Sequence, residues 1–285
     1  MIGLVIIFLK ILSLILKKFL SMVKGLEILL NNFEYRSDID GLRAIAVVPV
    51  ILFHSGISWL SGGYVGVDVF FVISGYLITS LIYAEIRNNT FSFVSFYQRR
   101  AARLLPALAI TLLTTVLFGL IFYNNAAFDN LGKQVFFASF GAANILFSQG
   151  INYFANDSAY QPLLHLWSLG VEEQFYIVWP VIVILLRKLP FNAFVGSIIL
   201  FFAVSLLLSV DAVASSNSKA YFLVQYRAFE LMLGAFVALY FSHSDRKMWS
   251  KLLKDALSIL GAILVISPMF ILNEHSIFPG FNALY

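Results

Sequence analysis

The chain has 285 residues, of which 60% are hydrophobic and only 12% are charged, and its mean hydropathy is +0.88. In soluble domains about a quarter of all residues are charged. This composition therefore excludes a soluble protein and predicts a polytopic membrane protein. The net charge is +4, and the basic residues lie in short clusters between apolar segments. This pattern is typical of residues that orient a protein in the membrane, and it does not indicate a nucleic-acid partner. The absence of cysteine excludes disulfides and thiol catalysis, and four scattered histidines show no metal-ligand spacing.

Residues 1–34 are rich in Leu and Ile but carry a polar stripe at helical spacing. The stripe consists of Lys10, Ser13, Lys17, Ser21 and Lys24. A basic stripe opposite an apolar face favours an amphipathic helix in the membrane interface, with a spanning helix as the alternative. A translation start at Met22 or later is a third interpretation of this extension.

The next helix is predicted over residues 44–59, and it carries one histidine. Arg43 and His54 are eleven positions apart, which is about three helical turns plus roughly 20°, so both point the same way. Their axial separation of about 16 Å places His54 near mid-membrane if Arg43 lies at the surface of a core about 30 Å thick. An ionisable group at that depth is a candidate general base; the alternative is a histidine hydrogen-bonded to a neighbouring helix.

Further spanning helices are predicted over residues 67–83, 104–123, 175–186, 194–210, 221–241 and 256–272. The basic clusters belong on the cytoplasmic side: Arg99, Arg100 and Arg103; Arg187 and Lys188; Arg246, Lys247, Lys251 and Lys254. The segment 134–147 must then be re-entrant or interfacial, because the helices on either side of it run out and back. The predicted fold class is all-α, a polytopic transmembrane helical bundle of about seven to nine membrane helices plus the N-terminal extra helix.

Two candidate sites lie at helix borders. Asp68 follows a glycine-rich turn and either caps a helix N-terminus or belongs to a site. Arg100 and Arg103 stand at i, i+3 on one helical face, next to Arg99. Two guanidinium groups at a cytoplasmic border can bind the phosphates of an acyl-CoA or a nucleotide, and the alternative is a positive-inside anchor.

A second polar island occupies residues 165–176. On one continuous helix the residues that share a stripe are His165, Ser168, Glu172 and Tyr176. Glu173 points about 100° away, so one glutamate enters a site while the other caps or pairs. The alternative is an amphipathic interface helix with Trp167 in the aromatic belt.

Charges are rare inside the later apolar segments. Arg227 and Glu230 stand at i, i+3, and this spacing favours a structural ion pair over a catalytic one. No serine lies in the setting of a nucleophile elbow, so Ser-His-Asp hydrolysis is not supported.

Four ordered motifs and one spacing carry a family resemblance. The motifs are YRSDIDGLRAIAV at 35–47, GYVGVDVFFVISGY at 63–76, FYQRRAARLLP at 96–106 and WSLGVEEQFY at 167–176, and ten residues separate Arg43 from His54. Together they resemble the acyltransferase-3 family of membrane acyltransferases, in particular its O-antigen and peptidoglycan O-acetylase branch. The resemblance runs from about Tyr35 to the last residue and implies one acyltransferase-3 transmembrane domain over residues 35–285.

The resemblance implies an activity and a set of site residues. The activity is transfer of an acyl group, commonly acetyl, from cytoplasmic acyl-CoA to a hydroxyl of an envelope carbohydrate, in the bacterial inner membrane. The implied catalytic residues are His54, Arg43, Glu172 and Glu173, the acyl-CoA-binding residues Arg100, Arg103 and Arg99, and the supporting residues Asp68, His165, Ser168 and Tyr176. No metal is implied, and Gly170 stands where serine or another small residue is more usual.

The hypothesis from the sequence is therefore a membrane O-acyltransferase. His54 is expected to act as a base or as a transient acyl carrier, and the expected partners are acyl-CoA, the lipid bilayer and a glycan such as O-antigen, exopolysaccharide or peptidoglycan. The resemblance also implies further membrane helices after residue 285 and, in some relatives, a periplasmic hydrolase-like domain. The rival interpretations are a transporter or flippase of a glycan or lipid-linked sugar, which often has paired inverted repeats, and an inactive truncated remnant.

Overall fold

A computed structural model describes residues 36–285 apart from residues 152, 155–157, 159, 216–218 and 244–249. The predicted extension over residues 1–34 and the basic pair Arg246 and Lys247 lie outside the described residues. The chain divides into two compact units, which are described separately. Phe91–Phe122 belongs to one of them, whereas Ser37–Thr90 and Tyr123–Tyr285 form the other.

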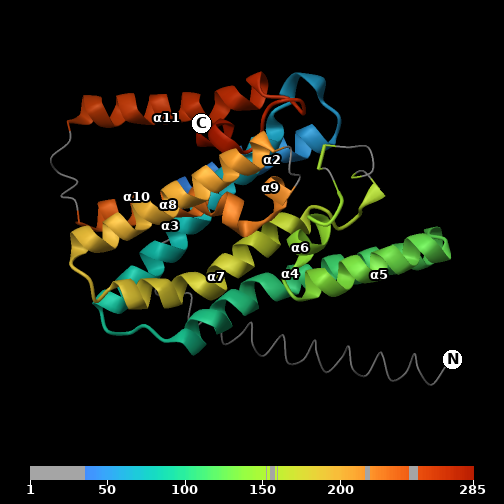
Figure 1. Cartoon of the computed structure of the whole chain (residues 1–285), viewed down its shortest axis with the longest axis horizontal. Helices are drawn as coiled ribbons and strands as arrows, with labels where there is room; N and C mark the ends of the chain where they lie inside the picture. The colour runs from blue at the N-terminus through green and yellow to red at the C-terminus, as the bar shows by residue number, and fades with distance from the viewer. Residues whose placement is uncertain (1–35, 152, 155–157, 159, 216–218, 244–249) are drawn as a thin grey trace. The chain divides into compact units, whose positions relative to one another are not determined.

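The regular elements of the described chain are helices (Figure 1). The first unit contains α4 (Phe93–Phe122). The second contains α2 (Ser37–His54), α3 (Gly66–Arg87), α5 (Asn125–Ser139), α6 (Ala143–Phe147), α7 (Leu166–Leu186), α8 (Phe191–Ala214), α9 (Lys219–Phe222), α10 (Val224–His243) and α11 (Lys251–Ile271), with short 3₁₀ turns at Ser58–Leu60, Gly63–Val65 and Gly280–Leu284.

Six segments of the described chain are long and apolar enough to cross a membrane. They are Gly63–Arg87, Phe93–Phe122, Leu166–Leu186, Phe191–Ala214, Lys219–Ser242 and Lys251–Ile271. The predicted fold class, an all-α membrane bundle, is therefore confirmed, and the protein is a multi-pass membrane protein. The predicted number of about seven to nine membrane helices stays a prediction, and α2, which contains most of the helix predicted to span over residues 44–59, is not among the six candidate spans.

Several helices begin earlier than their apolar runs indicate, because polar motifs continue the helix. The segment predicted over 175–186 is α7, which begins at Leu166, and the one predicted over 104–123 is α4, which begins at Phe93. The segment 134–147 is divided between α5 and α6, with Gly141 between them at φ +63°. Neither of these two helices is among the six candidate spans.

α2 ends at His54 because the glycine that follows reverses the chain. Gly56 has φ +77°, a conformation that suits glycine, and it donates from its N–H to the Phe53 carbonyl at 3.0 Å. The N–H of Ile57 donates to the carbonyl of Leu52 at 3.3 Å, which completes a glycine C-cap. The prediction of one helix over residues 44–59 is therefore wrong, since His54 is the last residue of its helix.

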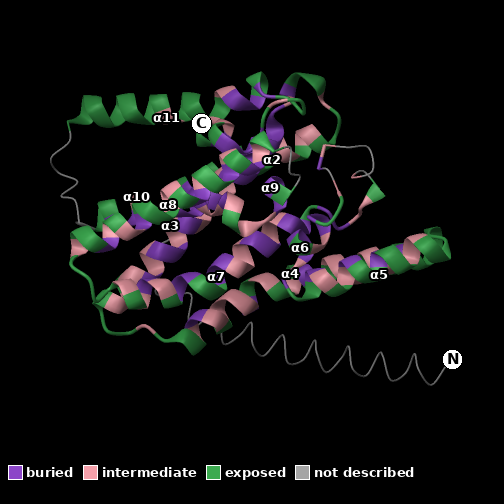
Figure 2. Ribbon diagram, in the orientation of Figure 1, coloured by how far each residue is buried: buried purple, intermediate pink, exposed green. Residues whose placement is uncertain are grey.

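α3 and α10 pack closely side by side at the centre of the second unit (Figure 1). A Cβ at Gly75 would overlap the carbonyl oxygen of Leu231, and a Cβ at Gly234 would overlap that of Val72. Close backbone approach through small residues is a common way for membrane helices to associate. Figure 2 shows burial concentrated on α3 and α10, whereas α11 is exposed along most of its length.

The starts of α3, α7 and α10 meet the ends of α2, α8 and α11 at one end of the second unit, here called the His54 end. Three contacts join these elements: Gly62 N–H to the Met269 carbonyl (3.0 Å), Gly280 N–H to Ser209 Oγ (3.2 Å), and Arg227 Nη2 to Asp68 Oδ1 (2.8 Å). The opposite end, here called the basic end, carries Arg87, Arg187, Lys188, Lys251 and Lys254. From residue 68 to residue 87 α3 rises about 28 Å, so the two ends are separated by most of a bilayer core.

Candidate functional site

His54 is exposed at the end of α2, and both of its ring nitrogens have partners. Nδ1 lies 2.8 Å from the Val50 carbonyl oxygen one turn earlier, and Nε2 lies 3.2 Å from the Tyr153 hydroxyl. A carbonyl can only accept, so Nδ1 carries the proton of the neutral ring, and Nε2 accepts from Tyr153. The helix backbone thus selects the tautomer whose basic nitrogen is directed at Tyr153.

Tyr153 is a site residue that the sequence did not indicate. Its side chain is 7% exposed, and its ring stacks on Tyr221 with centroids 4.1 Å apart. Burial raises the pKa of Tyr153 to about 12, so its hydroxyl keeps its proton at neutral pH and can donate to His54. It is one of 13 tyrosines and belongs to no motif, so no pattern in the chain could have identified it.

Arg43 lies on α2 about three turns before His54. Its Nη1 lies 3.3 Å from Asp40 Oδ1, and both side chains are partly exposed. A Cβ on Gly63 would overlap the carbonyl oxygen of Pro49, and a Cβ on Gly66 would overlap the carbonyl oxygen of Ala46. The end of α2 and the start of α3 therefore run antiparallel to each other. His54 therefore lies at the end of the unit, and Arg43 lies nearer its middle. The membrane depths predicted for Arg43 and His54 stay predictions, since α2 is not among the six candidate spans.

His165 comes directly before α7 and lies near His54. Although it is exposed overall, partial desolvation of its ring, and then the repulsion that a protonated His165 would have from a protonated His54, lower the pKa of His165. Its imidazole is therefore neutral at pH 7. Ser168 Oγ donates to the backbone carbonyl of His165 at 3.3 Å, which places this hydroxyl in the first turn of α7.

The two glutamates of α7 have different surroundings. Glu172 accepts from Ser74 Oγ at 2.7 Å through Oε1, and from the Tyr176 hydroxyl at 3.0 Å through Oε2. It thereby joins α7 to α3. Glu173 packs instead against Gly141, where a Cβ would overlap its carboxylate. Both lie about 10 Å farther along α7 than His165.

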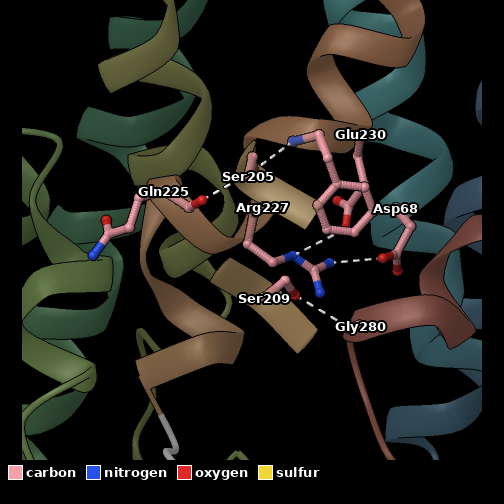
Figure 3. Close-up of polar contacts among 8 residues, drawn as sticks. Asp68, Ser205, Ser209, Gln225, Arg227, Glu230 and Gly280 are labelled. Carbon is pink, nitrogen blue, oxygen red and sulfur yellow. Dashed lines mark hydrogen bonds and ion pairs between the residues drawn. The ribbon is translucent and has the colours of Figure 1, made fainter. Parts of the chain in front are cut away.

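A buried ionic cluster lies beside the start of α3 (Figure 3). Arg227 Nη2 lies 2.8 Å from Asp68 Oδ1, and Arg227 Nε lies 3.3 Å from Glu230 Oε1. The side chains of Arg227, Asp68 and Glu230 are only 0%, 5% and 1% exposed. The ion pair predicted between Arg227 and Glu230 is present, and Asp68 adds a second carboxylate from another helix.

The three arginines of the family motif lie in the first turns of α4, in the other unit. Arg99 Nη1 donates to Ser95 Oγ at 2.6 Å, and the Arg100 guanidinium carbon lies 5.8 Å from the centroid of the Phe96 ring. Arg100 and Arg103 share one face of the helix because they are three positions apart. All three residues that are expected to bind acyl-CoA therefore lie on α4.

A cavity of about 320 Å³ lies at the basic end, where α3 and α10 finish. Its lining includes Tyr76, Ser80, Tyr83, Arg87, Asn88, Phe241 and Ser242. Arg87 gives it one cationic group that can pair with an anionic ligand. Within the described ranges, no group of three or more His, Asp or Glu side chains is arranged to hold a metal ion.

The molecule is a helical membrane protein with a histidine whose basic nitrogen is oriented. Residues 36–285 match the family model described as "Acyltransferase domain". The chain therefore belongs to the acyltransferase-3 family. No solved structure matches it.

Two of the curated relatives that the chain matches are named as an O-acetyltransferase and a putative O-acetyltransferase. The chain is 36% identical over 237 residues to "O-acetyltransferase OatA" of Staphylococcus aureus (strain NCTC 8325 / PS 47), covering 80% of this chain and 38% of that protein. It is 35% identical over 259 residues to "Putative O-acetyltransferase SAS0844" of Staphylococcus aureus (strain MSSA476), covering 86% of this chain and 42% of that protein. The chain thus spans less than half the length of these relatives.

Proposed function

We propose that the protein transfers an acetyl group from acetyl-CoA to a hydroxyl of a cell-envelope carbohydrate, as a multi-pass enzyme of the bacterial inner membrane. The observation that carries this proposal is the orientation of His54. Its Nδ1 proton is held by the Val50 carbonyl, so the basic Nε2 is presented at the open end of α2. Family membership and the names of the relatives support acyl transfer as the reaction.

In the proposed reaction, His54 acts as a general base. Its Nε2 leaves Tyr153 and accepts the proton of the acceptor hydroxyl while that oxygen attacks the thioester carbonyl carbon. Collapse of the tetrahedral intermediate breaks the C–S bond, and the imidazolium returns the proton to the leaving thiolate. The products are free CoA and an O-acetylated sugar, and His54 is again neutral.

The donor is proposed to approach from the basic end. Lys and Arg accumulate on the cytoplasmic side of membrane proteins, so Arg87, Arg187 and Lys251 favour a cytoplasmic basic end and a His54 end that faces away from the cytoplasm. Arg100 and Arg103, with Arg99, are proposed to hold the phosphates of acyl-CoA, because paired guanidinium groups bind phosphate bidentately.

The remaining predicted site residues have narrower proposed roles. Arg43 is proposed to orient the donor, and Glu172 and Glu173 to line the acyl path along α7. Ser168 and Tyr176 are proposed to support this path from the same helix, and His165 from the position directly before it. A periplasmic hydrolase-like domain, as in some members of the family, is a proposed further partner.

Sealed inside-out membrane vesicles test the donor and its side. Radiolabelled acetyl-CoA is added outside, and base-labile label is counted in the vesicle polysaccharide. We expect incorporation that falls at least tenfold in Arg100→Gln and Arg103→Gln, because each loses a charge-assisted phosphate contact. Arg187→Gln, a basic residue outside the motif, is the matched control and should retain incorporation. Wild-type incorporation in both motif variants would contradict the donor site, and glycan movement without acetyl-CoA would favour a transporter.

A further inference from the structure

Burying the charges of Arg227, Asp68 and Glu230 costs desolvation free energy, so we expect this cluster to do more than join two helices. Replacing a buried ion pair by apolar residues is often neutral or stabilising, so such a pair is weak support for stability alone. The close approach of α3 and α10 already depends on two glycines, Gly75 and Gly234. The cluster also lies next to the proposed active site, at the His54 end.

Aromatic rings enclose the Arg227 guanidinium. Its central carbon lies 5.4 to 5.7 Å from the ring centroids of Phe71, Trp167, Tyr221 and Phe278. These rings come from α3, α7, α9 and the segment after α11, so the charge holds four parts of the chain together. Nη1 of Arg227 makes no hydrogen bond to a described residue, so the four rings supplement the two ion pairs around the guanidinium.

One of these rings leads directly to His54. Tyr221 contacts the guanidinium at 5.4 Å and stacks on Tyr153 with centroids 4.1 Å apart and planes 21° apart. The Tyr153 hydroxyl then lies 3.2 Å from His54 Nε2. Three consecutive contacts thus connect a fully buried charge to the basic nitrogen of an exposed histidine.

We propose that Arg227 is a positioning residue for the reaction: through the ring of Tyr221 it fixes Tyr153, and the Tyr153 hydroxyl keeps the His54 ring in its reactive orientation until the acceptor hydroxyl replaces it at Nε2. Asp68 and Glu230 serve this role by fixing the guanidinium. The inference rests on the proposed function in that it takes His54 as the base. Displacing a reacting group by about 1 Å can cost a hundredfold in rate, so loss of this support should lower turnover and leave donor binding intact.

A double-mutant cycle in the full chain tests this role. Acetyl transfer from acetyl-CoA is measured for Arg227→Met, Tyr153→Phe and the double variant, with kcat and KM determined separately. We expect Arg227→Met to lower kcat between about tenfold and a hundredfold with KM for acetyl-CoA unchanged, and Arg227→Lys to recover part of the loss. In the Tyr153→Phe background, Arg227→Met should have little further effect, because residues that act through one another are not additive.

Losses that simply multiply in the double variant would overturn the inference, as would a change confined to KM. If Arg227→Met does not accumulate in membranes, Tyr221 provides the same test without touching the ion pairs. Tyr221→Leu removes the intervening ring and should reduce kcat, whereas Tyr221→Phe keeps the ring and should not. Equal activity in these two variants would overturn the inference. His54→Ala in the same assay separates the two claims. Full activity of His54→Ala would refute the proposed function. If His54→Ala is inactive and the losses of Arg227→Met and Tyr153→Phe multiply in the double variant, only this inference is refuted.

Discussion

Replacing Gly75 by alanine should open the α3–α10 interface. The new Cβ would overlap the carbonyl oxygen of Leu231, and its next contacts, the carbonyl carbon and Cα of Leu231, would lie at 2.7 and 2.9 Å. All three are backbone atoms, so no side chain can rotate away and the helices must separate. Overpacking costs about 1–3 kcal/mol, and we expect the upper limit here, about a hundredfold in the folding equilibrium.

Gly196→Ala is the matched control for this prediction. Gly196 also lies inside a membrane helix, but a Cβ there meets no atom within 4 Å, so alanine should be neutral or stabilise by up to about 1 kcal/mol. The measurement is the denaturation of detergent-solubilised protein, followed as the free energy of unfolding. Equal stability of Gly75→Ala and Gly196→Ala would refute the close contact between α3 and α10.

Three further predictions concern the site. Gly56→Ala should cost about 1–2 kcal/mol of unfolding free energy, because φ is +77° there, whereas Gly41→Ala, in open space on the preceding helix α2, should not destabilise. Glu172→Gln should cost about 1–3 kcal/mol, because one of the two carboxylate oxygens that accept from Ser74 and Tyr176 becomes an NH2 donor, and an unchanged denaturation midpoint would contradict this. The lowered pKa of His165 means that the unfolded chain binds more protons near pH 6.5, so the thermal midpoint should fall on acidification from about pH 7.5 to 5.5. That fall should be smaller in His165→Gln, and an identical fall would exclude this group as its source.

The membrane helices could be predicted from the sequence, because long apolar runs have few alternatives in a bilayer. Their ends could not be predicted as well. α7 begins at Leu166 rather than near Phe175, since its polar residues find partners on α3 and remain helical. α2 stops at His54 because Gly56 adopts a left-handed conformation, which a pattern of hydropathy does not detect.

The candidate site was only partly visible in the sequence for a related reason. The i, i+3 spacing of Arg227 and Glu230 is local and predicts their pairing. Asp68 joins them across 159 positions, and Tyr153 reaches His54 across 99 positions. Contacts this distant in the chain depend on how the helices pack, so motif spacing could indicate His54 but not its partner. The roles predicted for Arg43, Glu172 and the α4 arginines remain predictions.

The central claim is that His54 Nε2 accepts the proton of the acceptor hydroxyl. The most direct measurement is the rate of acetyl transfer by His54→Gln, compared with His275→Gln as a matched substitution of an exposed histidine in the segment after α11. We expect the rate of His54→Gln to fall at least a hundredfold, because general bases contribute about 10²–10⁴ in rate, while His275→Gln retains wild-type activity. A His54→Gln variant that transfers acetyl at the wild-type rate would contradict the claim.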